Sequence, residues 1–135
     1  KYSKEQILTH TKLPGEKIHV NYISFDSKQY FPLKKSSHNK MRIGYLGGLD
    51  GRKNVRLLVD AFEEIVIERD DIELHIGGGG SNLEAFRTRK IINAKFYGRI
   101  PETNTNQFMN SLDVFVFPSL EEGFGLPPLK KLKLH

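Results

Sequence analysis

The sequence contains no cysteine, which excludes disulfide bridges and thiolate metal sites and fits a reducing compartment. No stretch approaches the roughly 20 consecutive apolar residues of a membrane-spanning helix, and the N-terminus lacks the charged-then-apolar layout of a signal peptide. We therefore expect a soluble protein. The histidines are scattered, without the HExxH-like spacing of a zinc site: His10, His19, His38, His75 and His135.

The net charge of +5 is distributed unevenly along the chain. Most of the excess lies in the first third, at Lys1, Lys4, Lys12, Lys17, Lys28, Lys34, Lys35, Lys40 and Arg42. Basic patches can attract nucleic acid or an anionic membrane, but these residues are spread over loop-like sequence without interleaved aromatic residues. The pattern favours a solvated surface, and we expect no nucleic-acid partner.

Short apolar runs that end at glycine or proline predict a series of strands at residues 41–46, 72–76, 94–97 and 113–117. Continuous apolar runs are typical of parallel strands, because helices cover both of their faces. A weaker alternating run at residues 18–23 suits a half-buried strand. Helical patterns separate the strong runs, so the chain is predicted to be an α/β domain: a Rossmann-like parallel sheet with helices on both faces.

The helical patterns carry start signals of their own. Apolar residues recur at helical spacing from Asn54 onward, and Asn54 is a plausible N-cap. Ser81 and Glu84 have the spacing of a capping box ahead of a second helix. The sequence from Thr105 to Leu112 is typical of a short third helix. The order is therefore strand, helix, strand, helix, strand, helix, strand.

Ten of the twelve glycines lie at or just after the ends of the predicted strands: Gly47, Gly48, Gly51, Gly77, Gly78, Gly79, Gly80, Gly98, Gly123 and Gly125. Parallel strands end at one edge of the sheet, where open α/β sheets bind ligands. Glycine N–H groups and helix N-termini suit phosphate, so the edge predicts a nucleotide site. The alternative is that strand-to-helix loops are rich in glycine in any α/β protein. No G-x-G-x-x-G fingerprint or P-loop is present.

Two stretches agree in order and spacing with a known family: residues 43–62 (IGYLGGLDGRKNVRLLVDAF) and 113–129 (DVFVFPSLEEGFGLPPL). From about Ile18 to Leu129 the chain resembles the C-terminal domain of GT-B glycosyltransferases of the family-4 type. The resemblance implies one half of a GT-B fold, the nucleotide-sugar-binding domain of a retaining enzyme. Such an enzyme moves a hexose-like sugar from a nucleotide diphosphate sugar to an acceptor.

The resemblance also implies the partners. The nucleotide diphosphate sugar is the donor substrate, and no cofactor is expected. The acceptor, a saccharide or a lipid-linked acceptor, would bind through an N-terminal domain outside this chain. A cytoplasmic location is implied, with peripheral membrane association left open for the full-length enzyme. The alternative function is a non-catalytic module that binds a nucleotide or a sugar phosphate.

The resemblance implies catalytic roles for Glu122, Lys53 and Arg52. A leaving diphosphate gathers negative charge, which the basic pair at the start of a helix can stabilise, and Glu122 meets the donor sugar. The other implied donor-binding residues are Gly47, Gly48, Arg99, Ile100, Gly123, Phe124, Gly125, Leu126 and Lys130. A D-x-D triplet is absent, which agrees with metal-independent transfer. The alternatives are a solvated basic pair and an exposed Glu122.

The sequence departs from the family pattern at two of these positions. Lys130 stands eight positions after Glu122, where the E-x7-E motif has the second acid, which in the family holds the ribose hydroxyls. Gly48 stands where relatives often carry an arginine. Phosphate contact would then rest more on Lys53 and Arg52.

The resemblance also divides the chain. Residues 1–40 are expected to be a linking segment from the acceptor half, 41–129 an incomplete nucleotide-sugar-binding domain and 130–135 a non-native tail. A further strand would normally lie beside residues 113–117, so its loss would leave an apolar edge open to pairing. We therefore expect self-association through that edge.

Overall fold

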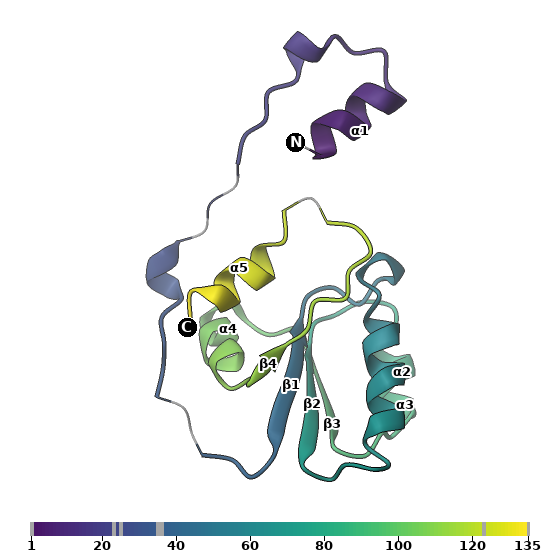
Figure 1. Cartoon of the computed structure of the whole chain (residues 1–135), viewed down its shortest axis with the longest axis vertical. Coiled ribbons are helices and arrows are strands. Elements are labelled where there is room, and N and C mark those ends of the chain that lie inside the picture. Colours follow the sequence, from purple (N-terminus) through teal and green to yellow (C-terminus); the bar gives the residue numbers. More distant parts are fainter. Residues whose placement is uncertain (1, 23, 25, 35–36, 123, 135) are drawn as a thin grey trace.

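The computed structural model describes residues 2–22, 24, 26–34, 37–122 and 124–134. Its centre is a parallel sheet with the strand order β3-β2-β1-β4 (Figure 1). The strands are β1 (Met41–Leu46), β2 (Ile72–Gly77), β3 (Ala94–Gly98) and β4 (Val114–Phe115). The predicted α/β class with a Rossmann-like parallel sheet is confirmed.

Helices cover both faces of this sheet (Figure 1). Helices α2 (Val55–Ile65) and α3 (Leu83–Thr88) lie on one side, and α4 (Glu102–Asn110) and α5 (Leu126–Leu132) lie on the other. A single 3-10 turn, η3 (Gly51–Lys53), precedes α2. None of the helices in the described ranges has both the length and the apolar character needed to cross a bilayer.

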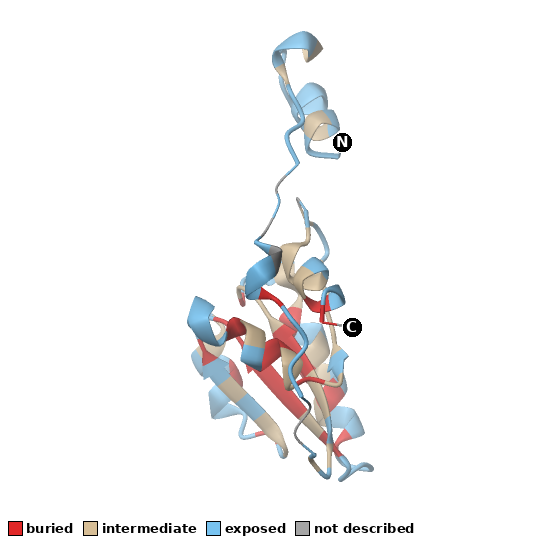
Figure 2. Ribbon diagram, turned by 90° about the vertical axis from the view of Figure 1, so that its left-hand side faces the viewer, coloured by how far each residue is buried: buried red, intermediate tan, exposed pale blue. Residues whose placement is uncertain are grey.

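The main core lies between the sheet and α2 with α3 (Figure 2). Val55, Val59 and Phe62 project from one face of α2 and are buried, as their spacing predicts. They pack against strand residues such as Leu74 and Ile76, which are fully buried. Each such side chain contributes about 1.5–3 kcal/mol on burial, so this layer carries much of the stability. A smaller cluster of Tyr30, Met109 and Leu134 lies on the opposite face.

The segment before the sheet contains α1 (Tyr2–His10), η1 (Gly15–Lys17) and η2 (Ser27–Gln29). Helix α1 lies away from the sheet (Figure 1) and buries no residue. The predicted strand at residues 18–23 is wrong for its described part, because Ile18–Tyr22 has no partner strand and is irregular. Ile23 lies outside the described residues.

The end of this segment docks against α4 through two asparagines one turn apart. The Phe31 N–H donates to Asn106 Oδ1 at 3.3 Å, and the Leu33 N–H donates to Asn110 Oδ1 at 2.9 Å. Asn110 also donates from Nδ2 to the Phe31 carbonyl at 3.1 Å. Tyr30, just before them, is only 2% exposed. Residues 30–33 are therefore part of the folded unit.

Neither predicted start signal forms a capping hydrogen bond from its side chain. Asn54 is the N-cap residue of α2, as predicted, but it lies in the left-handed conformation (φ 52°) and its side chain makes no capping hydrogen bond. Its Nδ2 instead donates to the Pro118 carbonyl at 3.3 Å. Helix α3 has Asn82 as its N-cap residue, so the capping box does not form. Glu84 instead pairs with Arg87 at 2.8 Å. The Asn54 side chain thus bonds to a distant carbonyl, and the Glu84 side chain bonds to a neighbouring cation.

Two predicted boundaries shift. Helix α4 begins at Glu102, because Pro101 is well suited to precede a first turn, and ends at Asn110 rather than Leu112. Strand β4 keeps only Val114 and Phe115 of the predicted 113–117, since only these two pair with β1. Val114 is 41% exposed, and self-association through this edge stays a prediction.

Candidate functional site

The loops that follow β1, β2 and β3 are hydrogen-bonded to one another at the carboxyl edge of the sheet. The Gly47 N–H donates to the Gly77 carbonyl at 3.0 Å, and the Gly78 N–H donates to the Gly98 carbonyl at 2.7 Å. Gly78 has φ 148°, and a Cβ there would lie 1.7 Å from the Gly47 oxygen. Only glycine allows this approach. The glycines that follow β1, β2 and β3 therefore gather at one edge, whereas Gly51 lines the opposite face and Gly123 lies outside the described residues.

The sequence-based idea that these glycines present open N–H groups is correct only in part. The N–H groups of Gly47 and Gly78 are used between the loops. The N–H of Gly48 has no such partner among the described residues. Phosphate binding through the backbone would therefore fall to Gly48 rather than to Gly47.

A cavity of about 490 Å³ opens between these loops and helices α4 and α5; we refer to it as the carboxyl-edge cavity. It is lined by six of the donor-binding residues expected from the sequence: Gly47, Gly48, Arg99, Ile100, Leu126 and Lys130. Gly78 and Gly79 contribute backbone, and Glu102, Thr105 and Met109 contribute side chains from α4. Residues that are far apart in the sequence thus line one cavity at this edge of the sheet.

The catalytic candidates do not line this cavity. Lys53 and Glu122 form an ion pair in which Lys53 Nζ donates to Glu122 Oε1. Their side chains are only 17% and 24% exposed, and Lys53 Nζ lies 6.0 Å from the centre of the Phe117 ring. Arg52 is exposed beside them. Lys53 and Glu122 are therefore brought together, although the sequence places them 69 residues apart.

Of the turn after Glu122, Phe124 is 39% exposed and does not line the cavity. Gly125 has φ 75° and forms the N-cap of α5, a conformation that favours glycine. Gly123 lies outside the described residues. Gly125 thus leads the chain into α5, and α5 carries Leu126 and Lys130 to the cavity.

The surroundings of Glu122 favour its ionised form, and its negative charge affects the nearby Tyr45. Burial raises the pKa of Glu122, but the hydrogen bond from Lys53 and the charges of Lys53 and Arg52 outweigh it, so the pKa lies below its usual range. The buried Ser119 hydroxyl adds to the lowering without meeting hydrogen-bond geometry. Burial, and then the charge of Glu122, raise the pKa of Tyr45. Tyr45 donates from its hydroxyl to the Gly48 carbonyl at 2.8 Å and stacks on Phe117, the ring over which Lys53 Nζ lies. These contacts connect the ion pair to the Gly47–Gly48 loop.

Lys130 belongs to a cluster that sequence reasoning missed. Lys130 Nζ donates to Glu102 Oε1 at 3.2 Å and lies 4.6 Å from the centre of the Tyr30 ring. The Tyr30 hydroxyl donates to the same Glu102 oxygen at 2.6 Å. Glu102 went unnoticed because the helix was predicted to begin at Thr105. An acid just after Pro101, in the first turn of a helix, was the available signal.

Helix α5 is anchored by Lys131, the residue after Lys130. Lys131 is 7% exposed, and its Nζ donates to the carbonyls of Met109 and Leu112 at 2.8 Å each. These carbonyls lie at the C-terminal end of α4, where a cation is favourable. Residues 130–132 are therefore helical, and Lys130 and Lys131 pack against neighbouring side chains and carbonyls, whereas Leu132 is 70% exposed. That native sequence ends near Leu129 stays a prediction.

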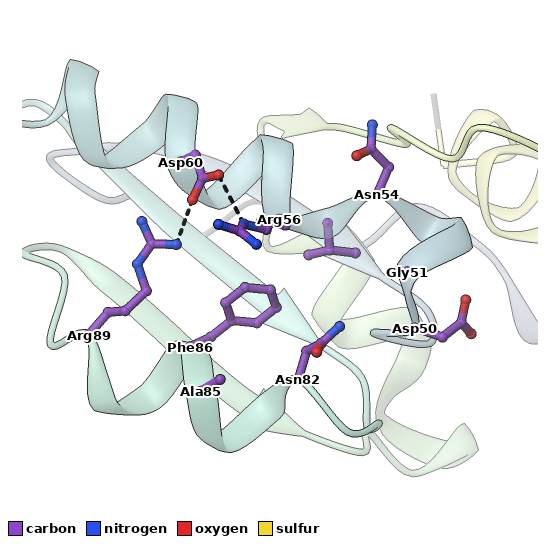
Figure 3. A pocket seen from close by; sticks show the side chains of 10 residues that line it. Asp50, Gly51, Asn54, Arg56, Asp60, Asn82, Ala85, Phe86 and Arg89 are labelled. Atoms are coloured by element: carbon purple, nitrogen blue, oxygen red, sulfur yellow. Dashed lines mark hydrogen bonds and ion pairs between the residues drawn. The ribbon is translucent and has the colours of Figure 1, made fainter.

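A second and larger hollow, of about 580 Å³, lies between α2 and α3 on the other face of the sheet (Figure 3); we refer to it as the α2–α3 groove. Asp60 pairs there with Arg89 at 2.6 Å and with Arg56 at 3.5 Å (Figure 3). Arg89 also binds Glu63. The charged groups of this groove therefore largely neutralise one another.

The buried histidine of the sheet is packed, as its position on a strand predicts. His75 Nε2 lies 2.8 Å from Glu73, and Nδ1 lies 2.8 Å from the Tyr97 hydroxyl. Burial lowers the pKa of His75 and outweighs the opposing effect of Glu73. Within the described ranges, no three histidine or acidic side chains gather as a metal-binding group.

Comparison with known proteins identifies the family. The sequence profile of the family "Glycosyl transferases group 1" matches residues 40–134. A curated glycogen synthase from Mycoplasma mobile is 30% identical over 95 residues, which cover 67% of this chain and 20% of that protein. The chain thus spans only a fifth of the length of this relative.

Solved structures show the same fold. HepE from Anabaena, in complex with UDP and glucose, has a TM-score of 0.76 at 17% identity, covering 98% of this chain and 40% of that chain. A mutant of S. aureus TarM, in complex with fondaparinux, α-GlcNAc-glycerol and UDP, has a TM-score of 0.73 at 17% identity, with 99% and 27% covered. The architecture matches one half of a GT-B glycosyltransferase fold. On the family match, this chain belongs to the glycosyl transferases of group 1.

Proposed function

We propose that this chain is the nucleotide-sugar-binding half of a retaining glycosyltransferase of the family-4 type. The whole enzyme would move a hexose-like sugar from a nucleotide diphosphate sugar to a saccharide or lipid-linked acceptor. The carboxyl-edge cavity is the observation that carries this proposal. It brings Gly48, Arg99 and Lys130 from separate loops and helices to the edge where open α/β sheets bind nucleotides.

The ion pair beside the cavity supplies the chemistry. Lys53 and Arg52 are cations next to the loop that would hold the diphosphate, and they would stabilise the negative charge of the leaving group. In the free chain, Lys53 is held by Glu122. A bound diphosphate would compete for Lys53, and Glu122 would then accept hydrogen bonds from hydroxyls of the donor sugar.

The comparisons support a nucleotide-sugar donor. HepE was solved with UDP and glucose, and TarM was solved with UDP and saccharides. Glycogen synthase is itself named for building a polysaccharide. We extend a UDP-sugar or GDP-sugar donor to this chain as part of the proposal. We propose metal-independent transfer without a further cofactor, because cations of the chain stand beside the diphosphate site.

One observation favours a second candidate function, a non-catalytic module that binds a nucleotide or sugar phosphate. Lys130 occupies the position of the second acid in the motif that starts at Glu122, and it is paired with Glu102. A domain that has lost catalysis could tolerate this change. Sugar transfer by the full-length protein in the presence of UDP-sugars or GDP-sugars would support the enzyme. Tight nucleotide binding without donor turnover would support the module.

The first test is a calorimetric titration of the chain with UDP, GDP and their glucose conjugates. Lys53→Ala is expected to weaken binding about tenfold or more, because a charge-assisted contact to phosphate is lost. Lys95→Ala is the matched control, since Lys95 is also paired with an acid, Glu73, but lies away from the cavity. No binding of either nucleotide at millimolar concentration contradicts the proposal.

A further inference from the structure

The carboxyl-edge cavity has one carboxylate among its described lining residues, that of Glu102. Glu102 lies in the first turn of α4. The other polar side chains of the lining are Thr105 and the cations Arg99 and Lys130. The Thr105 hydroxyl is already bonded to the Pro101 carbonyl at 3.2 Å. A ligand hydroxyl that must donate a hydrogen bond therefore meets Glu102 as its strongest acceptor in this cavity.

The geometry leaves part of this carboxylate open. Tyr30 and Lys130 both donate to Oε1, at 2.6 Å and 3.2 Å. Oε2 has no partner among the described residues. A carboxylate offers about four acceptor positions, and the Glu102 side chain is 67% exposed. Glu102, which lines the cavity, therefore keeps one carboxylate oxygen free to accept further hydrogen bonds.

The carboxylate is also fixed in place before any ligand arrives. Tyr30 is almost fully buried, and Lys130 is held between the Tyr30 ring and Glu102 with its side chain only 18% exposed. Hydrogen bonds from Tyr30 and then Lys130 hold the pKa of Glu102 below its usual range, so the group stays ionised at neutral pH. A charged acceptor that is already oriented loses little freedom on binding.

We propose that Glu102 is a specificity-determining residue of the cavity, whose free carboxylate oxygen accepts hydrogen bonds from a vicinal diol of the bound nucleotide sugar. Tyr30 and Lys130 are positioning residues that hold the carboxylate from its other oxygen. This inference rests on the proposed function and deepens it. It also gives Lys130 a role, because a cation cannot accept a hydrogen bond but can orient an acid that does.

A nucleotide sugar carries such diols both on its ribose and on its sugar, and the experiment separates the two sources. Calorimetric titrations would compare UDP with 2′-deoxy-UDP, GDP with 2′-deoxy-GDP, and UDP with UDP-glucose. Each would be run on the unmodified chain and on Glu102→Gln. Glu84→Gln is the matched control, because Glu84 is also a first-turn acid paired with a cation, on α3. Circular dichroism would verify that each variant is folded.

If the ribose supplies the diol, the ribonucleotide is expected to bind about tenfold more tightly than its 2′-deoxy form. That ratio should fall toward one in Glu102→Gln and stay unchanged in Glu84→Gln. If the sugar supplies the diol, the ribonucleotide and its 2′-deoxy form should bind equally tightly. Glu102→Gln should then weaken the binding of UDP-glucose about tenfold and leave the binding of UDP unchanged. Either result supports the inference.

The failures are distinguishable. Nucleotide binding with neither comparison altered by Glu102→Gln would overturn the role of Glu102 and leave the proposed function standing. Absence of binding by the unmodified chain would remove both. Lys130→Met tests positioning: it should lower the same selectivity ratio, but by less than Glu102→Gln. An unchanged ratio in Lys130→Met would reject the positioning role.

Discussion

Two hollows of this domain, the α2–α3 groove and the carboxyl-edge cavity, differ more in what lines them than in size. The α2–α3 groove is the larger, at about 580 Å³ against about 490 Å³ for the carboxyl-edge cavity. In the groove, Asp60 is paired with both Arg89 and Arg56. In the cavity, glycine backbone is exposed to a ligand and Glu102 keeps one oxygen open. Volume alone would therefore favour the α2–α3 groove over the cavity that we propose for the nucleotide sugar.

The difference has a topological cause. The ends of parallel strands meet at one edge, so loops from distant parts of the chain bring their backbone groups together there. The groove is instead formed by two neighbouring helices, and its side chains hold those helices to each other. Ion pairs of that kind stabilise by well under a few kcal/mol at an exposed position. Charged side chains that are paired with each other in this way have few hydrogen-bonding groups left for a ligand.

The largest expected effect separates the glycines of the two hollows. Gly78→Ala should destabilise the chain by about 3 kcal/mol or more, because a Cβ at φ 148° would overlap the Gly47 oxygen. Gly51→Ala, in the groove, meets nothing within 4 Å and should change stability by less than about 1 kcal/mol. Urea denaturation measures both. Equal losses would show that the loop packing at the sheet edge is not specific.

A somewhat smaller effect is expected for α5, the wall of the cavity. Lys131→Met should cost about 1–3 kcal/mol, because the carbonyls of Met109 and Leu112 lose their buried donor. Lys133 is exposed, and Lys133→Met is the control, with an expected change within about 0.5 kcal/mol. Thermal unfolding of both variants is the measurement. If Lys131→Met were as stable as the control, α5 would not be anchored through this side chain.

The ion pair near the cavity should appear in the pH dependence of stability. Because the folded pKa of Glu122 is depressed below its ordinary value of 4.5, the unfolded chain binds more protons in this range. The contribution of Glu122 is fully present above pH 4.5 and is lost as the pH falls through the folded pKa. Below about pH 4.5, the free energy of unfolding should thus fall more steeply with decreasing pH for the unmodified chain than for Glu122→Gln. Parallel profiles would remove the evidence for this pair in solution.

The smallest effect belongs to the groove. Arg89→Ala should destabilise by less than about 1 kcal/mol, and added salt should reduce the difference, because Arg89 and Asp60 are 30% and 41% exposed. Nucleotide affinity should not change at all. A calorimetric titration alongside a salt series measures both quantities. Weakened nucleotide binding in Arg89→Ala would move the ligand site toward the groove.

The local sequence predicted most of the fold, because the positions of the strands and helices follow the periodicity of apolar residues. The apolar run at Ile72–Ile76 and the buried face of α2 both lie where the pattern placed them. Start signals were less reliable, since Asn54 and Ser81 have side chains that can bond in several directions. Asn54 found a distant carbonyl at Pro118 instead of the helix. A cap is a local preference that a tertiary contact of similar energy can replace.

For the candidate site, the sequence named the loops but not the partners. The strand-end glycines and the family resemblance pointed to Gly48, Arg99 and Lys130, which all line the cavity. Glu102 was missed, because its only local signal is its place after Pro101 in a first helical turn, whereas its importance comes from contacts with Tyr30 and Lys130. Neither contact leaves a trace in the local pattern.

The sequence by itself determined the alternation of strands and helices and the glycine-rich edge, because these depend on periodicity and on backbone freedom within a few residues. Only the tertiary structure decided which charges meet. Lys53 pairs with Glu122 across 69 residues, and Tyr30 meets Glu102 across 72. Such pairs depend on how the sheet edge and helices close in space. The Glu102 carboxylate is oriented in this way by Tyr30 and Lys130, which lie 72 and 28 residues away in the sequence.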